Sequence, residues 1–230
     1  MAIKAVLFDL GNTLVKYDYG LPEEVFQRVL SSLGIPKALD DIKKAFRSAE
    51  QEAQETKLFS FAGKIACEDF WYQWDALVLK HLQVGETEAL PRRVHSEWME
   101  HVDCTLYPEV REVLSELNDR GLKMGLISNA YEEEIDLVLK KADLDKGLFD
   151  IIVGVDTIGQ IKPSPSNFKY AITKLDVNSD ETIFVGDNLE ADYYGAENAG
   201  LHALLVDRTD KQHRDLKTIQ NLTEILAQVS

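Results

Sequence analysis

The stretch VLFDLGNTL, residues 6–14, ends an apolar run with the carboxylate of Asp9 and continues at once with Leu10 and Gly11. Residues 3–8 are rich in Ile, Val and Phe, and a short run of this composition is typical of a strand buried on both faces. A carboxylate at the tip of such a strand needs a reason, because burying a charge without a partner is costly. The stretch therefore predicts a buried strand and, at its end, a candidate functional residue.

Strand-like and helical patterns alternate along much of the chain. Further strand-like runs lie at 123–127 (KMGLI), 150–153 (DIIV), 181–185 (ETIFV) and 201–206 (LHALLV). Helical patterns lie between them, at 108–120, 132–142, 166–175 and 190–199. Such alternation is typical of βαβ units. It predicts an α/β fold, a three-layer, doubly wound, Rossmann-like parallel sheet covered by helices on both faces.

Residues 16–104 interrupt this alternation. They contain no strand-like run, and they show amphipathic helical stretches near 22–34, 38–56, 67–82 and 86–101. We therefore expect two domains, a Rossmann-like core of residues 1–15 and 105–230, and an inserted α-helical domain of residues 16–104. Because large aromatic side chains dominate cores, we expect the core of the insertion to contain Trp71, Trp74 and Trp98.

Composition limits the classes of partner and the compartment. A formal net charge of -15 and a pI of about 4.7 repel polyanions, so we expect no nucleic acid and no anionic membrane as partners. A small anionic ligand would need local positive charge or a metal. The two cysteines, Cys67 and Cys104, lack metal-type spacing and indicate a reducing compartment. The apolar run before Asp9 is too short for a secretory signal, which predicts a cytoplasmic protein.

Polar side chains follow several of the predicted strands. Because ligands bind beyond the carboxyl ends of the strands in an open parallel sheet, these side chains are the first candidates for a site. They are Asp9, Ser128 and Asn129 in LISNA, Lys162 in QIKPSP, and Asp187 and Asn188 in VGDN. Singly, each has an ordinary reading as a helix cap, a helix-dipole partner or a solvated lysine. Together they predict one polar site at one edge of the sheet.

This ordered set of segments resembles the haloacid dehalogenase superfamily, a large group of mostly phosphate-transferring hydrolases. The matching pieces are FDLGNTL with Asp9, LISNA with Ser128, IKPSPSNF with Lys162, and VGDNLEAD with Asp187 and Asp192. The resemblance covers roughly residues 1–15 and 105–230. It implies that the inserted helical domain, residues 16–104, is a mobile cap over the active site.

The resemblance implies a Mg²⁺-dependent phosphatase acting on a small phosphorylated metabolite. Asp9 would be the nucleophile that forms an aspartyl phosphate, which water later hydrolyses. A hard divalent ion with oxygen ligands would cancel the repulsion between this carboxylate and a phosphate. The implied Mg²⁺ ligands are Asp9, the main-chain carbonyl of Gly11, and Asp187 directly, with Asp192 or Asn188 in support. The implied phosphate-binding groups are Ser128, Lys162, and the main-chain N–H groups of Leu10, Gly11, Asn12 and the helix start that includes Asn129.

Gly11 departs from the family pattern. Most phosphatases of the superfamily carry a second Asp here as general acid, a contribution worth about 10²- to 10⁴-fold in rate. Three readings stay open: a substrate with a good leaving group, such as an acyl phosphate or sugar 1-phosphate; an acid from the cap or from water; or a site that binds without turnover. Two rival functions follow, a 2-haloacid dehalogenase that uses the same Asp without a metal, and a degenerate phosphate-binding or regulatory protein. The Asp of VGDN disfavours the dehalogenase.

Overall fold

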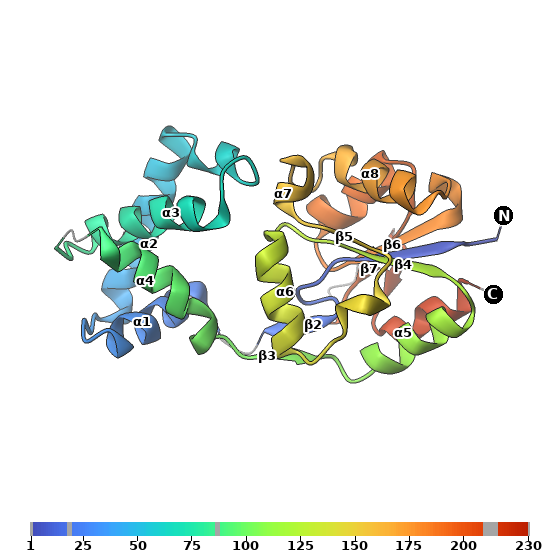
Figure 1. Ribbon diagram of the computed structural model, residues 1–230, viewed down its shortest axis with the longest axis horizontal. Coiled ribbons are helices and arrows are strands. Elements are labelled where there is room, and N and C mark those ends of the chain that lie inside the picture. The colour runs from blue at the N-terminus through green and yellow to red at the C-terminus, as the bar shows by residue number, and fades with distance from the viewer. Residues whose placement is uncertain (1, 18–19, 86–87, 209–215, 230) are drawn as a thin grey trace. The chain divides into compact units, whose positions relative to one another are not determined.

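The computed structural model describes residues 2–17, 20–85, 88–208 and 216–229 (Figure 1). The chain divides into two compact units. The core unit comprises Met1–Lys16 and Cys104–Ser230, and the helical unit comprises Tyr17–Asp103.

The core unit is built on a six-stranded sheet with the strand order β5-β4-β1-β6-β7-β8. Neighbouring strands of this sheet pair in parallel, which confirms the α/β fold class. The strands are β1 (Ala5–Phe8), β4 (Lys123–Ile127), β5 (Ile151–Val153), β6 (Thr182–Gly186), β7 (His202–Val206) and β8 (Thr218–Ile219). β1 lies between β4 and β6 and all four of its side chains are fully buried, as expected for a strand covered on both faces.

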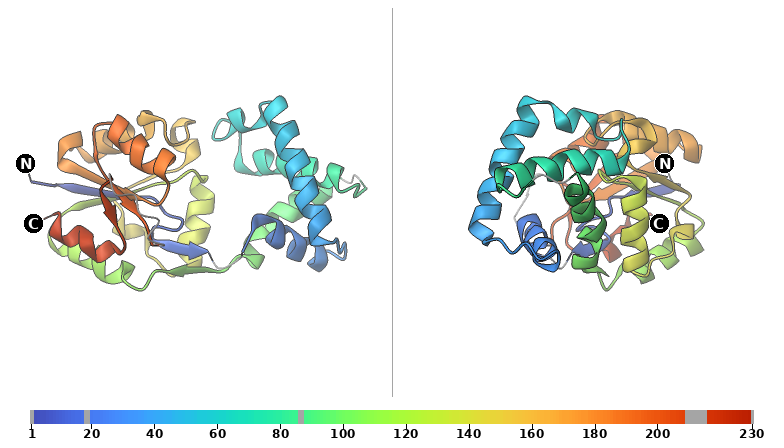
Figure 2. Two further views of the ribbon diagram at one scale, coloured as in Figure 1. Left: turned by 180° about the vertical axis from the view of Figure 1, so that it is seen from behind. Right: turned by 60° about the vertical axis from the view of Figure 1, so that its left-hand side comes forward.

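Helices cover both faces of this sheet. They are α5 (Val110–Asp119), α6 (Glu132–Lys141), α7 (Val155–Ile158), α8 (Pro165–Leu175) and α9 (Gly195–Asn198). α5 and α8 lie on opposite faces, as Figure 1 shows and the view from behind in Figure 2 repeats. On the α8 face, Phe168 meets Phe184 of β6 edge to face, with ring centroids 4.9 Å apart. Burial of such rings anchors the helix on the sheet.

The chain between the two units passes through a small sheet that the sequence did not predict. β2 (Val15–Tyr17) and β3 (Cys104–Leu106) form this two-stranded sheet. The prediction that residues 16–104 contain no strand is therefore wrong at both ends of the segment. Strands of three residues are too short to show an alternating pattern.

The helix predicted at 190–199 is also different in the structure. The segment begins with a π-helical turn, η5 (Leu189–Tyr194), and continues into α9. Asn188 caps the turn, because its side-chain Oδ1 accepts hydrogen bonds from the N–H groups of Glu190 and Ala191. Single π-helical turns are frequent at functional sites, and this one carries Asp192.

The helical unit contains α1 (Pro22–Ser32), α2 (Leu39–Glu55), α3 (Cys67–His81) and α4 (Ala89–Trp98). α3 packs against both α2 and α4. Phe46 of α2 meets Phe26 and Trp74 edge to face, with ring centroids 5.2 and 5.7 Å apart. Trp71, Trp74 and Trp98 are half-buried, so they line the packed interior without being its most buried members. Among the residues that the structure describes, no helix is both long enough and apolar enough to cross a membrane.

Candidate active site

Asp9 begins the site, directly after β1. The parallel pairing of β1 with β6 continues to this residue, because the Asp9 N–H donates a 2.8 Å hydrogen bond to the carbonyl of Val185. Its side chain is only 12% exposed. The fully buried Thr13 lies one turn further along and its Oγ1 donates to Asp9 Oδ2 over 3.4 Å. The main chain of the central strand therefore fixes where this carboxylate sits.

Lys162 joins two carboxylates from different segments. Its Nζ donates to Asp9 Oδ1 and to Asp192 Oδ1, each at 2.6 Å. The lysine side chain is only 3% exposed, so these are buried, charge-assisted hydrogen bonds. Burial opposes the charge of this ammonium, but Asp9 and Asp192 raise the pKa of Lys162 above its usual value. Lys162 is therefore held in its protonated form.

Asn129 holds the main chain of Lys162. Its Oδ1 accepts from the Lys162 N–H at 2.7 Å, and its Nδ2 donates to the Lys162 carbonyl at 3.2 Å. The side chain of Asn129 thus positions the lysine, while its predicted phosphate contact is through the main-chain N–H. Ser128, one residue earlier, is half-buried after β4, and its own N–H donates to the carbonyl of Val153.

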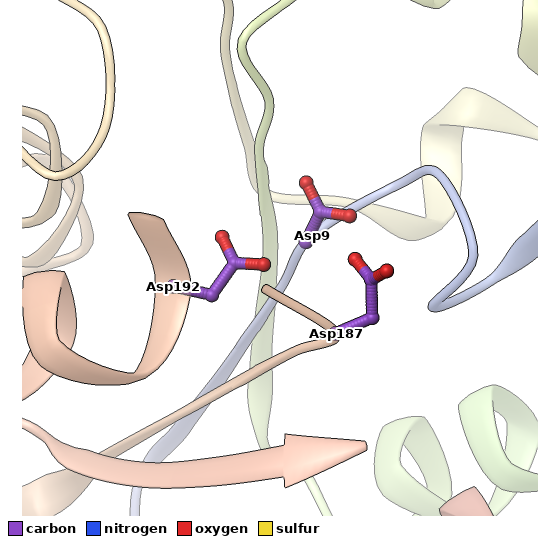
Figure 3. Close-up of side chains that lie close together, drawn as sticks. All are labelled: Asp9, Asp187 and Asp192. Atoms are coloured by element: carbon purple, nitrogen blue, oxygen red, sulfur yellow. The ribbon is translucent and has the colours of Figure 1, made fainter. Parts of the chain in front are cut away.

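Asp187 and Asp192 complete a cluster of acidic groups with Asp9. Each residue offers a carboxylate oxygen, and these oxygens all lie within 4.8 Å of one another. Figure 3 shows the three side chains reaching toward one another from the end of β1, the end of β6 and η5. Asp192 is only 2% exposed, and its Oδ2 accepts from the N–H of Asn188 at 3.0 Å. We call Asp9, Asp187 and Asp192 the carboxylate cluster.

The cluster carries more negative charge than its protein surroundings balance. Burial raises the pKa of Asp9 to about 7, opposed by the Lys162 ammonium and increased further by Asp192. Burial and the neighbouring Asp192 also raise the pKa of Asp187. When all three carboxylates are ionised, one ammonium leaves two negative charges uncompensated. A group of oxygen ligands with this charge suits a hard divalent cation.

The loop after β1, residues 10–15, which we call the β1 loop, folds back on itself. The Leu10 carbonyl accepts hydrogen bonds from Leu14 N–H at 3.0 Å and Val15 N–H at 2.9 Å. Asn12 adopts a left-handed conformation with φ 56, which Asn tolerates better than most residues. Its side chain lies close enough to Asp187 to lower the pKa of that carboxyl, against the burial that raises it. The loop therefore lies beside both Asp9 and Asp187.

The Asn12 N–H, one of the predicted phosphate contacts, already has a partner within the β1 loop. The Asn12 N–H donates to the carbonyl of Val15 at 2.7 Å, because Gly11 and Val15 form an isolated β-bridge that closes the loop. In this structure the N–H is engaged and does not point to a ligand. The side chain of Asn12, by contrast, lies beside Asp187 of the carboxylate cluster.

The structure also shows site residues that the sequence did not reveal. Thr13 bonds to Asp9, and Arg208 bonds to the carbonyls of Asn12 and Thr13. Arg208 follows β7 at the same sheet edge as the cluster, so its position after a strand was a usable signal. A single arginine in a loop is usually solvated, however, and nothing local in the sequence distinguishes this one.

Comparison with known proteins now identifies the family. A family model described as haloacid dehalogenase-like hydrolase matches residues 3–200. The chain belongs to the haloacid dehalogenase-like hydrolases. This confirms the resemblance drawn from the four motifs, and it makes the protein a hydrolase.

Individual relatives of this haloacid dehalogenase-like hydrolase match only in part. Pyrophosphatase PpaX from Bacillus mycoides is 34% identical over 105 residues, which are 46% of this chain and 48% of the relative. Pyrophosphatase PpaX from Bacillus anthracis is 33% identical over 112 residues, 49% of this chain and 51% of the relative. The chain thus spans about half the length of the curated relatives it matches.

Solved structures match over the whole chain. The magnesium-bound structure of YfnB from Bacillus subtilis has a TM-score of 0.73 at 21% identity, covering 100% of this chain and 99% of that one. A 2-haloacid dehalogenase from Pseudomonas syringae pv. Tomato has a TM-score of 0.72 at 21% identity, covering 99% and 100%. At such identities the likeness shows the fold alone, and that fold is shared by enzymes of different chemistry.

Proposed function

We propose that this haloacid dehalogenase-like hydrolase is a Mg²⁺-dependent phosphatase that uses Asp9 as its nucleophile and acts on a small phosphorylated molecule. The observation that carries the proposal is the carboxylate cluster, whose oxygens lie within 4.8 Å of one another, with Lys162 bridging Asp9 and Asp192. Supporting residues come from four separate segments at one sheet edge, where ligands of open α/β sheets bind.

The cluster suits Mg²⁺ by donor type and by charge. Mg²⁺ prefers oxygen ligands and binds with few protein carboxylates. Asp9 and Asp187 would hold it directly, together with the main-chain carbonyl of Gly11. Asp192, whose oxygens accept hydrogen bonds from Lys162 and from the Asn188 N–H, would support the site, as the family resemblance implies. When bound, the cation would offset the repulsion between the cluster and the phosphate of a substrate.

The protein's own groups would then carry the reaction. A carboxylate oxygen of Asp9 forms a bond to phosphorus as the bond to the leaving oxygen breaks, which gives an aspartyl phosphate. Water attacks the phosphorus in a second step and regenerates the Asp9 carboxylate. Lys162 keeps Asp9 oriented and places a positive charge beside the phosphoryl oxygens, and the Ser128 hydroxyl would bind one of those oxygens.

Gly11 narrows the class of substrate. In most phosphatases of the superfamily, the residue at this position is an Asp that supplies the proton to the leaving oxygen. Glycine has no side chain that could donate one. Phosphoryl compounds with weakly basic leaving groups depend least on this proton. Acyl phosphates, sugar 1-phosphates and inorganic pyrophosphate have such leaving groups, and pyrophosphate is the substrate class in the name of the PpaX relatives.

The helical unit would serve as the cap. It is inserted between the β1 loop and the remainder of the core unit, which is where the family resemblance predicts a cap. A substrate preference would then depend on its side chains, since the core unit supplies only the phosphoryl chemistry.

Phosphate release decides between this function and its rivals. Acetyl phosphate, glucose 1-phosphate, pyrophosphate and p-nitrophenyl phosphate are assayed with and without Mg²⁺, for the wild type and Asp9→Asn. We expect Mg²⁺-dependent release that is lost in Asp9→Asn. Metal-independent halide release from a 2-haloacid would favour the dehalogenase, and phosphate binding without turnover would favour a degenerate binding protein.

A further inference from the structure

Arg208 contacts the β1 loop through several groups at once. Its Nη2 donates to the Thr13 carbonyl at 2.9 Å, and its Nε makes a longer contact of 3.4 Å to the Asn12 carbonyl. Its Nη1 donates to Glu109 Oε1 at 2.8 Å, and the guanidinium lies 3.4 Å from the centroid of the Tyr107 ring. The side chain is only 17% exposed, so most of its surface is covered by the protein.

Glu109 makes this arrangement rigid. It directly precedes α5, and its carboxylate also accepts from the Leu222 N–H at 3.5 Å. Although burial opposes it, hydrogen bonds from its own main chain and from Arg208 lower the pKa of Glu109 below its usual value. A carboxylate that stays ionised is a permanent anchor for the arginine. Arg208 therefore connects the β1 loop to Glu109, the residue directly before α5.

The carbonyls that Arg208 binds belong to the two loop residues that touch the carboxylate cluster. The Asn12 side chain lies close enough to Asp187 to lower the pKa of that carboxyl, against the burial that raises it, and the Thr13 hydroxyl donates to Asp9 over 3.4 Å. Asn12 also holds a left-handed conformation that the loop must maintain. A shift of the Asn12 and Thr13 carbonyls would move both of these contacts together.

We propose that Arg208 is a positioning residue that fixes the β1 loop and thereby the arrangement of Asp9 and Asp187 for a divalent cation; the cation part rests on the proposed function. Nothing in the four family motifs assigns this residue. The planar guanidinium suits the task because its donors form a fork that binds Glu109 and two carbonyls simultaneously while its face lies on Tyr107. A lysine ammonium could keep the ion pair but not the whole set of contacts.

The test compares Arg208→Gln and Arg208→Lys with a matched control, Arg120→Gln. Arg120 also donates to a glutamate, Glu116 at 2.9 Å, and to a carbonyl, that of Leu226 at 2.8 Å, but it has no contact with the β1 loop among the described residues. Amide hydrogen exchange of residues 12, 14 and 15 is measured on the metal-free proteins, because these N–H groups close the loop. Mg²⁺ affinity is measured by calorimetric titration, and global stability by denaturant unfolding.

We expect Arg208→Gln to accelerate exchange of these amides and to weaken Mg²⁺ binding by about 10-fold or more, the usual effect of losing an outer partner of a metal site. Arg208→Lys should lie between it and the wild type, and Arg120→Gln should change global stability alone. Exchange and Mg²⁺ affinity that are unchanged in Arg208→Gln, or shifted equally in Arg120→Gln, would overturn the inference. If Arg208→Gln does not fold, Arg208→Lys decides by the same criteria. A wild type that binds no Mg²⁺ would refute the proposed function, and the exchange rates would still decide whether Arg208 fixes the loop.

Discussion

Gly186→Ala adds a single methyl group, and we expect it to disturb the carboxylate cluster strongly. Gly186 ends β6, and a Cβ added to it would lie 2.4 Å from both Cγ and Oδ2 of Asp192 and 2.5 Å from its Cβ. Non-bonded carbon atoms approach to about 3.5 Å, so Asp192 would have to retreat by about 1 Å. Asp192 is a short, buried side chain, and its Cβ can move only if η5 moves with it.

The expected effect on function follows from that displacement. The 2.6 Å bond between Asp192 Oδ1 and Lys162 Nζ would lengthen past hydrogen-bonding distance. Lys162 would then be held by Asp9 alone, and the cluster would lose its shape. We expect Gly186→Ala to lower phosphatase activity by about 100-fold, the usual consequence of a misplacement of about 1 Å. Mg²⁺ affinity should fall by about 10- to 100-fold.

The assay pairs Mg²⁺ titration calorimetry with phosphate release from acetyl phosphate. Gly85→Ala is the matched control, because a Cβ at Gly85 would meet no atom of the described residues within 4 Å, its chain neighbours aside. Overpacking in Gly186→Ala should also cost about 1 to 3 kcal/mol of unfolding free energy, which denaturant unfolding measures separately. If Gly186→Ala kept the wild type's Mg²⁺ affinity and activity, the position of Asp192 would not depend on the space at residue 186.

Three further predictions concern buried charges. Because burial raises the pKa of Asp9 to about 7 in the folded protein, the native state binds more protons than the unfolded chain from about pH 4 to about pH 7, and stability falls with rising pH. Asp9→Asn should therefore melt higher than the wild type in EDTA at about pH 8, and the difference should shrink toward about pH 4; a constant difference would contradict this. Lys162→Met removes the ammonium between Asp9 and Asp192 and should lower kcat by about 10²- to 10³-fold. Circular dichroism should show an intact fold for this variant. A near-normal kcat would exclude a catalytic role for Lys162. Asp75 of the helical unit is 3% exposed, and burial raises its pKa well above the usual value. Asp75→Asn should therefore stabilise the protein by on the order of 1 kcal/mol at about pH 8 and by less at about pH 4. Thermal melts at both pH values would show this difference.

Much of the core unit could be predicted because its signals are local. Strands such as β1 are continuous apolar runs, and the alternation of such runs with amphipathic helices defines a parallel α/β sheet. Polar residues directly after those strands, including Asp9 and Asp187, could be selected by position alone, since the carboxyl ends of the strands meet at one edge. Neither step requires knowledge of distant contacts.

The remaining features depend on contacts that the sequence does not reveal. β8 has two residues, too few to show a period. Arg208 and Glu109 form an ion pair although they lie 99 residues apart in the sequence. The side-chain amide of Asn129 likewise binds the main chain of Lys162, which belongs to another segment. The π-helical turn that carries Asp192 has the composition of an ordinary helix start, and only its buried contacts distinguish it.

Titration of the protein with Mg²⁺ in a calorimeter tests most directly whether the carboxylate cluster is a divalent-cation site. We expect the wild type to bind one Mg²⁺ and Asp187→Asn, which removes a charge but keeps the side chain's shape, to weaken this binding by at least about 10-fold. Binding should also tighten as the pH rises through about 7, because protons and the cation compete for Asp9. A wild type that binds no Mg²⁺, or equal binding by Asp187→Asn, would show that the carboxylate cluster is not a divalent-cation site.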